Sequence, residues 1–321
     1  MAKAELTRDI TERTENDPRE LLVRAFFFAC ALLSILTTLG IIVLLVHEAM
    51  KFFSLTAPLL GVQGETVGVA EFLTGTEWQP SGDGTFGVLP LVSGTLIVTI
   101  GSGAIALPLG VATAMYLSEY ASPRARSVLK PALEILAGIP TVVYGVFAVV
   151  YITPFLGIIF PSISFFNAAS ASVVVGIMII PMVASISEDA MSAVPDELRE
   201  AGYGMGATKF EVTTGIVVPA AASGIFSSFI LGLSRAIGET MAVVLAMGGL
   251  ANLYDLTNPA SFLESGMTMT VAMIQLLLSD ISGGGVAYRA LFAIGLLLFV
   301  ITLAMNVVSD LVARRYREEY R

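Results

Sequence analysis

Residues 135–187, ILAGIPTVVYGVFAVVYITPFLGIIFPSISFFNAASASVVVGIMIIPMVASIS, contain no charged side chain, and this stretch decides the class of the protein. A helix needs roughly 20 apolar residues to cross the hydrocarbon core of a bilayer. The stretch is too long for one such helix and long enough for two. Its middle collects residues that favour turns, namely Pro154, Gly157, Pro161 and Asn167. We therefore predict membrane-spanning helices over about 135–151 and about 168–186.

The composition of the whole chain agrees with a membrane protein. Of its 321 residues, 55% are hydrophobic and 13% are charged, about half the charged share of a soluble domain. A water-soluble globule has to place more charge on its surface than this, and the same numbers exclude intrinsic disorder. The single cysteine, Cys30, excludes a disulfide scaffold. The net charge of −9 argues against nucleic acid as a partner.

Further apolar stretches complete a prediction of six spans and an all-α polytopic membrane fold. They cover residues 25–46, 88–117, 220–249 and 290–309. The polar leader before the first of them is too long and too acidic for a signal peptide, so we predict a retained span. A shorter apolar stretch, residues 266–279, is expected to be re-entrant or to lie at the membrane interface.

Basic residues gather on one side of this six-span arrangement. Six spans place both termini on the same side, and 14 of the 17 Lys and Arg residues fall there. Since cytoplasmic loops are enriched in Lys and Arg, this side is expected to be cytoplasmic. The longest outer loop holds the only tryptophan, Trp78, expected near the membrane surface. The predicted segments are a cytoplasmic tail (1–24), a first transmembrane helix (25–46), an extracytoplasmic loop (47–87), a transmembrane domain (88–313) and a cytoplasmic tail (314–321).

The sequence lacks the residue patterns of the common catalytic and nucleotide-binding sites. It contains no G-x-x-x-x-G-K-[ST] loop for nucleotide phosphates. One histidine and one cysteine cannot build a zinc site, and no serine nucleophile motif is present. We expect neither a catalytic residue nor a cofactor or metal, so any energy for transport has to come from another subunit.

The cytoplasmic loop over residues 187–219 predicts a helix, a glycine corner and a second helix. Pro195 and the acidic residues after it suit a first helical turn, and the helix should end at Gly204 and Gly206. A capping box over residues 208–211 then begins the second helix. Four apolar residues would face the cytosol: Leu198, Ala201, Met205 and Phe210. They fit docking into a partner's groove, although the local pattern fits a plain connecting loop equally well.

Two charges fall inside the predicted fifth span, Arg235 and Glu239. Residues four apart share a helix face, and a lone arginine at the bilayer centre costs at least ~2.5 kcal/mol. One interpretation is a structural pair that neutralises itself. The other is a cation lining an anion path, because arginine donates two parallel hydrogen bonds to an oxyanion, with Glu239 keeping the binding weak enough for release.

Glu134 is expected in the first turn of a helix beginning at Pro131, where the helix dipole accounts for it.

The 187–219 loop resembles the EAA loop of the permeases of ABC importers, whose pattern is E-A-A, three residues, G, nine residues and I-x-L-P. The matching residues here are Glu200, Ala201, Gly202, Gly206, Ile216, Val218 and Pro219. Gly202 replaces the second alanine and is expected to loosen the first helix; Val218 replaces leucine. The resemblance implies that this loop is the coupling helix that seats in an ATP-binding subunit.

Other motifs are similar to the phosphate-specific branch of this family, over about residues 86–315. They are FGVLP (86–90), SGT (93–95), PLG (108–110), YLSEY (116–120), EILAGIP (134–140) and GLSRAIGETMA (232–242). Met241-Ala242 after Gly238-Glu239-Thr240 is similar to the PstC type, whereas the sister permease usually has Ala-Pro there.

The resemblance implies a type I (MetI-like) permease of the cell membrane that forms half of a phosphate pore. Arg235 and Glu239 would line the substrate path. The implied partners are a sister permease of the PstA type, an ATP-binding subunit dimer and an extracytoplasmic phosphate-binding protein. Two alternatives remain open at this point: a permease for a related oxyanion such as sulfate, and a stand-alone secondary transporter or channel. An intramembrane enzyme is a weaker option.

Overall fold

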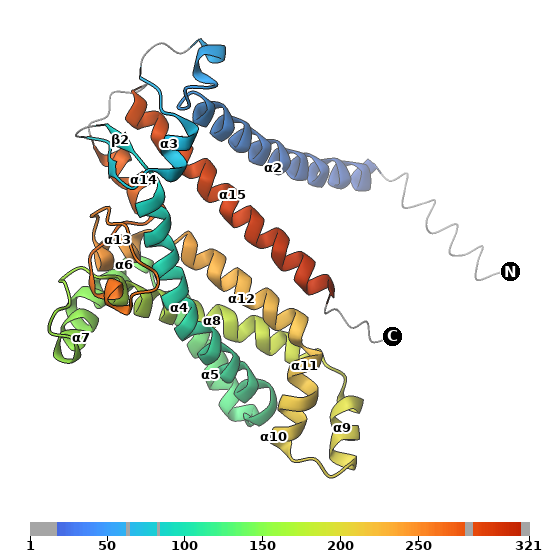
Figure 1. Ribbon diagram of the computed structural model, residues 1–321. Helices are drawn as coiled ribbons and strands as arrows, with labels where there is room; N and C mark the ends of the chain where they lie inside the picture. The colour runs from blue at the N-terminus through green and yellow to red at the C-terminus, as the bar shows by residue number, and fades with distance from the viewer. Residues whose placement is uncertain (1–17, 62–64, 82–83, 280–284, 316–321) are drawn as a thin grey trace.

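The computed structural model describes residues 18–61, 65–81, 84–279 and 285–315 and is almost entirely helical (Figure 1). Within these ranges, five helices are long and apolar enough to cross a membrane, and a sharply bent helix pair makes a sixth candidate. The longest are α2 (Pro18–Met50), α4 (Leu89–Met115), α8 (Ala168–Ser192) and α15 (Val286–Arg315). The prediction of an all-α membrane fold is confirmed.

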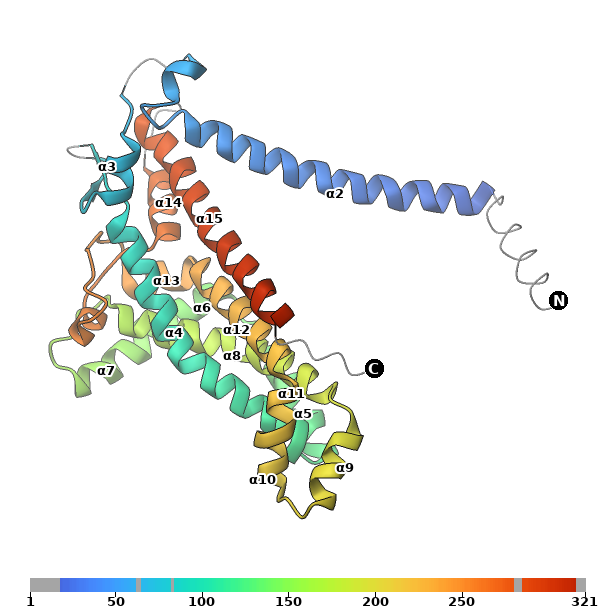
Figure 2. The same ribbon diagram turned by 45° about the vertical axis from the view of Figure 1, so that its right-hand side comes forward.

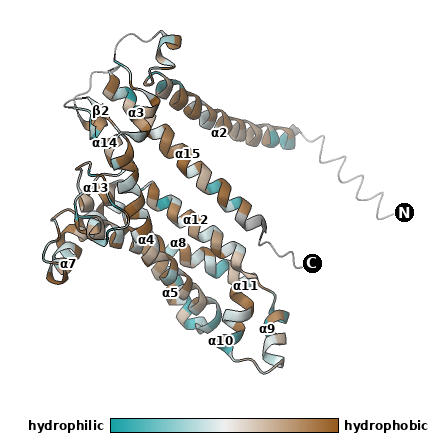
Figure 3. Cartoon of the chain, in the orientation of Figure 1, coloured by the Kyte–Doolittle hydropathy of each residue, from teal (hydrophilic) through white to brown (hydrophobic). Residues whose placement is uncertain are grey.

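Helix α2 stands away from the other helices. Figures 1 and 2 both show it leaning outward, with only its C-terminal end near α15. It extends beyond the predicted 25–46 at both ends. Its side chains are apolar (Figure 3) and exposed along most of its length in the single chain. Such a helix is stable in lipid, or against another membrane subunit, because its backbone groups are satisfied within the helix itself.

The outer loop forms a small aromatic core after α2. It contains the 3₁₀ turn η1 (Ala57–Leu60), helix α3 (Val69–Thr74) and an antiparallel hairpin of β1 (Trp78–Gln79) and β2 (Thr85–Phe86). Phe86 contacts both Phe52 and Trp78 edge to face, with ring centroids 5.6 and 5.9 Å apart. Trp78 is 7% exposed, so its side chain lies inside this core, and its position relative to the membrane surface stays a prediction.

Helices α4 and α8 pack closely along their lengths at the centre of the molecule. A Cβ built at Gly110 of α4 would lie 2.6 Å from the Val183 Cγ1 of α8, so the two backbones approach only because this residue is glycine. Small residues at helix contacts are typical of membrane proteins. At its C-terminal end α4 continues into the π-helical turn η2 (Tyr116–Tyr120).

The predicted third span differs from the structure at both ends. Helix α5 (Pro123–Ala137) begins at Pro123, where the Ser122 hydroxyl accepts a hydrogen bond from Ala125 N–H. Glu134 therefore lies in the last turn of α5, and the expectation of a first-turn position stabilised by the helix dipole is wrong. After a break at residues 138–140 comes the candidate membrane span Thr141–Ile159. It consists of α6 (Thr141–Phe147), the π turn η3 (Ala148–Ile152) and α7 (Thr153–Ile159).

The predicted fifth span is discontinuous. A bend of 71° at residue 221 separates the segment Lys209–Ala220 from α12 (Ala222–Ile237), and a second break over residues 238–240 separates α12 from α13 (Met241–Met247). The expectation of one helix over 220–249 is wrong. The 3₁₀ turn η5 (Pro259–Leu263) and the short helix α14 (Met269–Leu278) follow, and α14 packs beside α15 and α4.

Candidate functional site

A helix–corner–helix element projects from one end of the molecule (Figures 1 and 2). Helix α9 (Asp196–Gly204) leads through the corner to α10 (Lys209–Val212), which continues as the π turn η4 (Thr213–Val217) and α11 (Val218–Ala220). This confirms the helix, glycine corner and helix predicted for the loop. Thr208 Oγ1 accepts from Glu211 N–H at 3.3 Å, and Glu211 Oε2 accepts from Thr208 N–H at 2.7 Å, so the predicted capping box is formed. Hydrogen bonds from Thr208 hold the pKa of Glu211 below its ordinary value.

Glycines at two positions shape this element for different reasons. Gly206 has φ +85°, a left-handed conformation that ends α9 and that other residues adopt only at a cost. A Cβ built at Gly202 would lie 2.7 Å from Ile216 Cδ1 and 2.9 Å from Val212 Cγ2. The two helices can therefore pack closely at Gly202, and α9 continues through it to Gly204 despite the expected loosening.

The tip of the element exposes apolar side chains. Met205 and Phe210 are 82% and 64% exposed, and Ala201 and Glu200 are also exposed. Leu198 is an exception to the prediction, since it lies half-buried against the small core that α9 and η4 share with the ends of α4 and α8. Pro219 is exposed just before the 71° bend, and Ile216 is half-buried beneath Gly202.

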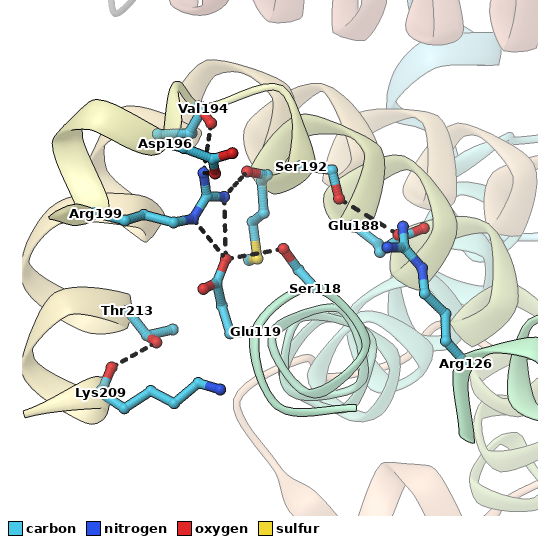
Figure 4. Close-up of polar contacts among 11 residues, drawn as sticks. Ser118, Glu119, Arg126, Glu188, Ser192, Val194, Asp196, Arg199, Lys209 and Thr213 are labelled. Carbon is cyan, nitrogen blue, oxygen red and sulfur yellow. Dashed lines mark hydrogen bonds and ion pairs between the residues drawn. The ribbon is translucent and has the colours of Figure 1, made fainter. Parts of the chain in front are cut away.

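Arg199 of α9 ties the element to the turn η2 at the C-terminal end of α4 (Figure 4). Glu119 Oε1 in η2 accepts hydrogen bonds from Arg199 Nε at 3.4 Å and from Nη2 at 3.1 Å. Nη2 also donates to the Met191 carbonyl at 2.8 Å. The Arg199 and Glu119 side chains are 14% and 5% exposed. Lys209 Nζ lies 5.0 Å from the centroid of the Tyr120 ring, so the second helix of the element also contacts η2.

A second ionic cluster joins α5 to α8. The Glu188 carboxylate is buried and pairs with Arg126 and with Lys130, whose Nζ lies 2.8 Å from Glu188 Oε2. Lys130 also lies 3.5 Å from Asp189 Oδ1. The hydrogen bond that Lys130 Nζ donates to Glu188 is the main reason why the pKa of Lys130 is raised. Neither ionic cluster is predictable from the sequence pattern, because the paired residues lie 58 to 80 residues apart. The one local signal is the i,i+4 spacing of Arg126 and Lys130.

Arg235 and Glu239 do not form the predicted side-by-side pair. Helix α12 ends at Ile237, and the Glu239 carboxylate accepts a hydrogen bond from Ala242 N–H at 3.1 Å, at the start of α13. Thr270 Oγ1 of α14 donates to the Glu239 carbonyl at 2.9 Å. Among the described residues, Arg235 has no ion pair with Glu239 or any other carboxylate. The expectation that the two share one helix face is wrong because the helix is interrupted between them.

Arg235 instead lies exposed beside a pocket of about 320 Å³. The pocket lies between α5, α8 and α12, and Lys130, Glu134 and Glu188 also line it together with apolar residues of α8. Arg235 and the ionic cluster of α5 and α8 therefore line one cavity. Within the described ranges, no group of His, Cys, Asp and Glu residues could hold a metal ion. A guanidinium in such a cavity has the geometry to bind an oxyanion through paired hydrogen bonds.

Comparison with known proteins places this arrangement in a family. The family described as the binding-protein-dependent transport system inner membrane component matches residues 106–318. The chain belongs to this family. Like other binding-protein-dependent inner membrane components, it is a transport subunit of the permease class and is embedded in the membrane.

Two similar relatives cover most of the chain. One is the probable ABC transporter permease protein YqgH of Bacillus subtilis, 33% identical over 96% of each chain. Another is the phosphate transport system permease protein PstC of Xylella fastidiosa, 32% identical over 86% of each chain. Among solved structures, a bacterial alginate ABC transporter in complex with a pentasaccharide-bound periplasmic protein has a TM-score of 0.63 at 14% identity, covering 92% of this chain and 95% of that one. At this identity the likeness concerns the fold of the inner membrane component.

Proposed function

We propose that this inner membrane component is the permease subunit of an ATP-driven phosphate importer and forms half of its translocation pore. The relatives that are phosphate transport permeases support the substrate. The observation that carries the proposal is Arg235, an exposed guanidinium on a membrane helix beside a cavity of about 320 Å³. Arginine matches the geometry of a phosphate oxygen pair.

The break between α12 and α13 determines which carboxylates act on an anion bound at Arg235. Because Glu239 accepts from Ala242 N–H, its carboxylate acts on the start of α13 and does not neutralise the arginine. Release is instead favoured by the carboxylate of Glu134, which lines the same pocket. Conduction requires that an ion bind well enough to enter and weakly enough to leave, and a pocket with both signs of charge meets this requirement.

The cytoplasmic element is proposed to couple the pore to a separate ATP-binding subunit dimer. The coupling residues would be Glu200, Ala201, Gly202, Gly206, Ile216 and Pro219. The exposed apolar side chains of Met205 and Phe210 support this coupling role, since exposed apolar groups on a short helix fit a groove in a partner. This chain would then hydrolyse no ATP itself, and it would change between outward and inward openings as the dimer closes and opens.

The remaining partners follow from the same proposal. A sister permease of the PstA type would complete the pore, and an extracytoplasmic phosphate-binding protein would deliver the ion. The alginate transporter solved in complex with a periplasmic protein supports such a delivery route. Both termini, and the element of α9 and α10, would face the cytoplasm. The tails of residues 1–24 and 314–321 would then be cytoplasmic, and the loop of 47–87 would lie outside the membrane on the opposite side. The first span of 25–46 and the domain of 88–313 would cross the membrane between them.

Reconstitution of the four components in proteoliposomes tests this function. We expect ATP hydrolysis to be stimulated by phosphate-loaded binding protein and phosphate to accumulate only when ATP is present. Stimulation by a sulfate-loaded binding protein, with no response to phosphate, would reassign the substrate to sulfate. Uptake by this chain alone, without nucleotide, would indicate a stand-alone transporter and contradict the proposal.

A further inference from the structure

The covalent connection from the cytoplasmic element to the Arg235 helix is a sharp bend. The segment Lys209–Ala220 meets α12 at 71°, immediately after Pro219. Residues at the ends of elements can act as hinges, because a few backbone dihedrals absorb a change of angle between the helices. A displacement of α9 and α10 would therefore be absorbed in part at residue 221 before it reached Arg235.

A second connection runs through side chains and bypasses the bend at residue 221. Arg199 of α9 binds Glu119 with two of its nitrogens, at 3.1 and 3.4 Å, and also donates to the carbonyls of Met191 and Val194. Figure 4 shows Arg199 and Glu119 pointing toward one another between α9 and the end of η2. Both side chains are largely shielded from solvent. Arg199 Nη1 also lies 3.0 Å from the exposed Asp196 carboxylate, so removing Glu119 leaves Arg199 one partner, whereas removing Arg199 leaves the buried Glu119 charge poorly compensated.

Glu119 belongs to a helix that reaches from the cytoplasmic element to the opposite end of the molecule. The continuous helix runs over 32 residues, Leu89–Tyr120, which is roughly 48 Å at 1.5 Å per residue. Near its far end, Ser93 Oγ accepts from Tyr254 N–H and Thr95 Oγ1 accepts from Met269 N–H, each at 3.1 Å. In its middle, a Cβ built at Gly103 would lie 2.8 Å from Leu233 Cδ2 of α12.

We infer that the Glu119–Arg199 ion pair is the link through which α4 carries movement of the cytoplasmic element to the Arg235 helix and the far mouth of the pore. Arg199 and Glu119 are positioning residues in this scheme, and neither touches the transported ion. Lys209 on the Tyr120 ring provides a second attachment to the same turn. The inference rests on the proposed function, since it concerns how that importer is driven.

The test compares phosphate transported per ATP hydrolysed in the complete reconstituted importer with phosphate-loaded binding protein. The variants are Glu119→Gln, Arg199→Gln and the double variant, which removes both buried charges and so avoids an uncompensated one. We expect the ratio to fall about tenfold in all three, since allosteric coupling is typically worth 5- to 150-fold. Glu48→Gln is the control, because Glu48 pairs with Lys51 at the far end of α2, and it should keep the wild-type ratio.

The outcomes separate coupling from folding. If the pair only stabilises the fold, the variants melt at lower temperature but assembled complexes of the double variant keep the full ratio, and that result overturns the inference. If Glu119→Gln fails to assemble, Glu119→Asp keeps the charge on a shorter side chain and should show an intermediate ratio; a full ratio would again contradict the link. Failure of the proposed function is distinct, because the wild-type complex would then move no phosphate per ATP.

Discussion

The Glu239 carboxylate accepts a hydrogen bond from the Ala242 backbone N–H at 3.1 Å, in the first turn of α13, which begins at Met241, six residues after Arg235. A side-chain oxygen that satisfies a free N–H in the first turn stabilises the start of a helix. This contact, together with the Thr270 hydroxyl on the Glu239 carbonyl, keeps the chain interrupted inside the membrane and leaves Arg235 open to the pocket.

Two substitutions distinguish a capping role of Glu239 from a charge-tuning role. Glu239→Gln keeps a side-chain oxygen for Ala242 N–H, so we expect near-normal ATP-dependent uptake and thermal stability. Glu239→Ala removes the acceptor and should lower the free energy of unfolding by about 0.5–2 kcal/mol, the usual value of a cap. Uptake and melting of the purified complexes check both. Equal loss of uptake in the two variants would show that the negative charge itself is needed.

Replacement of Arg235 removes the proposed anion-binding group without removing a structural ion pair. Since Arg235 is exposed beside the pocket, Arg235→Ala should leave assembly of the importer intact. ATP-dependent phosphate uptake should fall at least about tenfold, the factor set by a loss of 1.4 kcal/mol. Size-exclusion chromatography measures assembly, and radiolabelled phosphate measures uptake. Normal uptake by assembled Arg235→Ala complexes would end the substrate-path assignment.

The glycine corner gives a prediction on stability with a matched control two residues away. Gly206 has φ +85°, whereas Gly204 does not have a positive φ, and a Cβ at either position would meet no atom within 4 Å. Gly206→Ala should therefore cost about 1–2 kcal/mol of strain in the left-handed region, and Gly204→Ala should cost nothing measurable. Thermal unfolding of the isolated chain in detergent tests this. Equal melting temperatures for the two variants would show that the corner relaxes freely.

The exposed tip gives a prediction on binding to the ATPase. Met205→Asp places a charge where an apolar side chain is 82% exposed, so folding should be unaffected. Binding of the ATP-binding subunit should weaken about tenfold or more, as expected for a residue at the centre of an interface. Pull-down of the ATPase by the purified permease measures it. Undiminished binding would move the docking surface away from this tip.

Local patterns in the sequence predicted much of this molecule. Charge-free stretches gave the long helices, because a membrane helix needs a minimum apolar length. The capping box at Thr208 and Glu211 and the corner at Gly206 were correctly predicted, since caps and left-handed glycines are local features.

Features that depend on distant contacts were not predicted. The break at Glu239 depends on Thr270 of another helix, and the spacing of Arg235 and Glu239 alone favoured a continuous helix. Glu119 and Arg199 lie 80 residues apart, so only the packing of α9 against η2 brings them together. Pro131 favours a helix start, but the Ser122 cap begins α5 about two turns earlier, at Pro123.

The nucleotide dependence of phosphate movement shows whether this chain forms half of an ATP-driven importer. Liposomes would contain either this chain alone or this chain with the sister permease, the ATP-binding dimer and phosphate-loaded binding protein, and phosphate uptake would be followed with and without ATP. We expect uptake only in the complete system with ATP. Phosphate uptake through this chain alone, without nucleotide, would contradict this expectation.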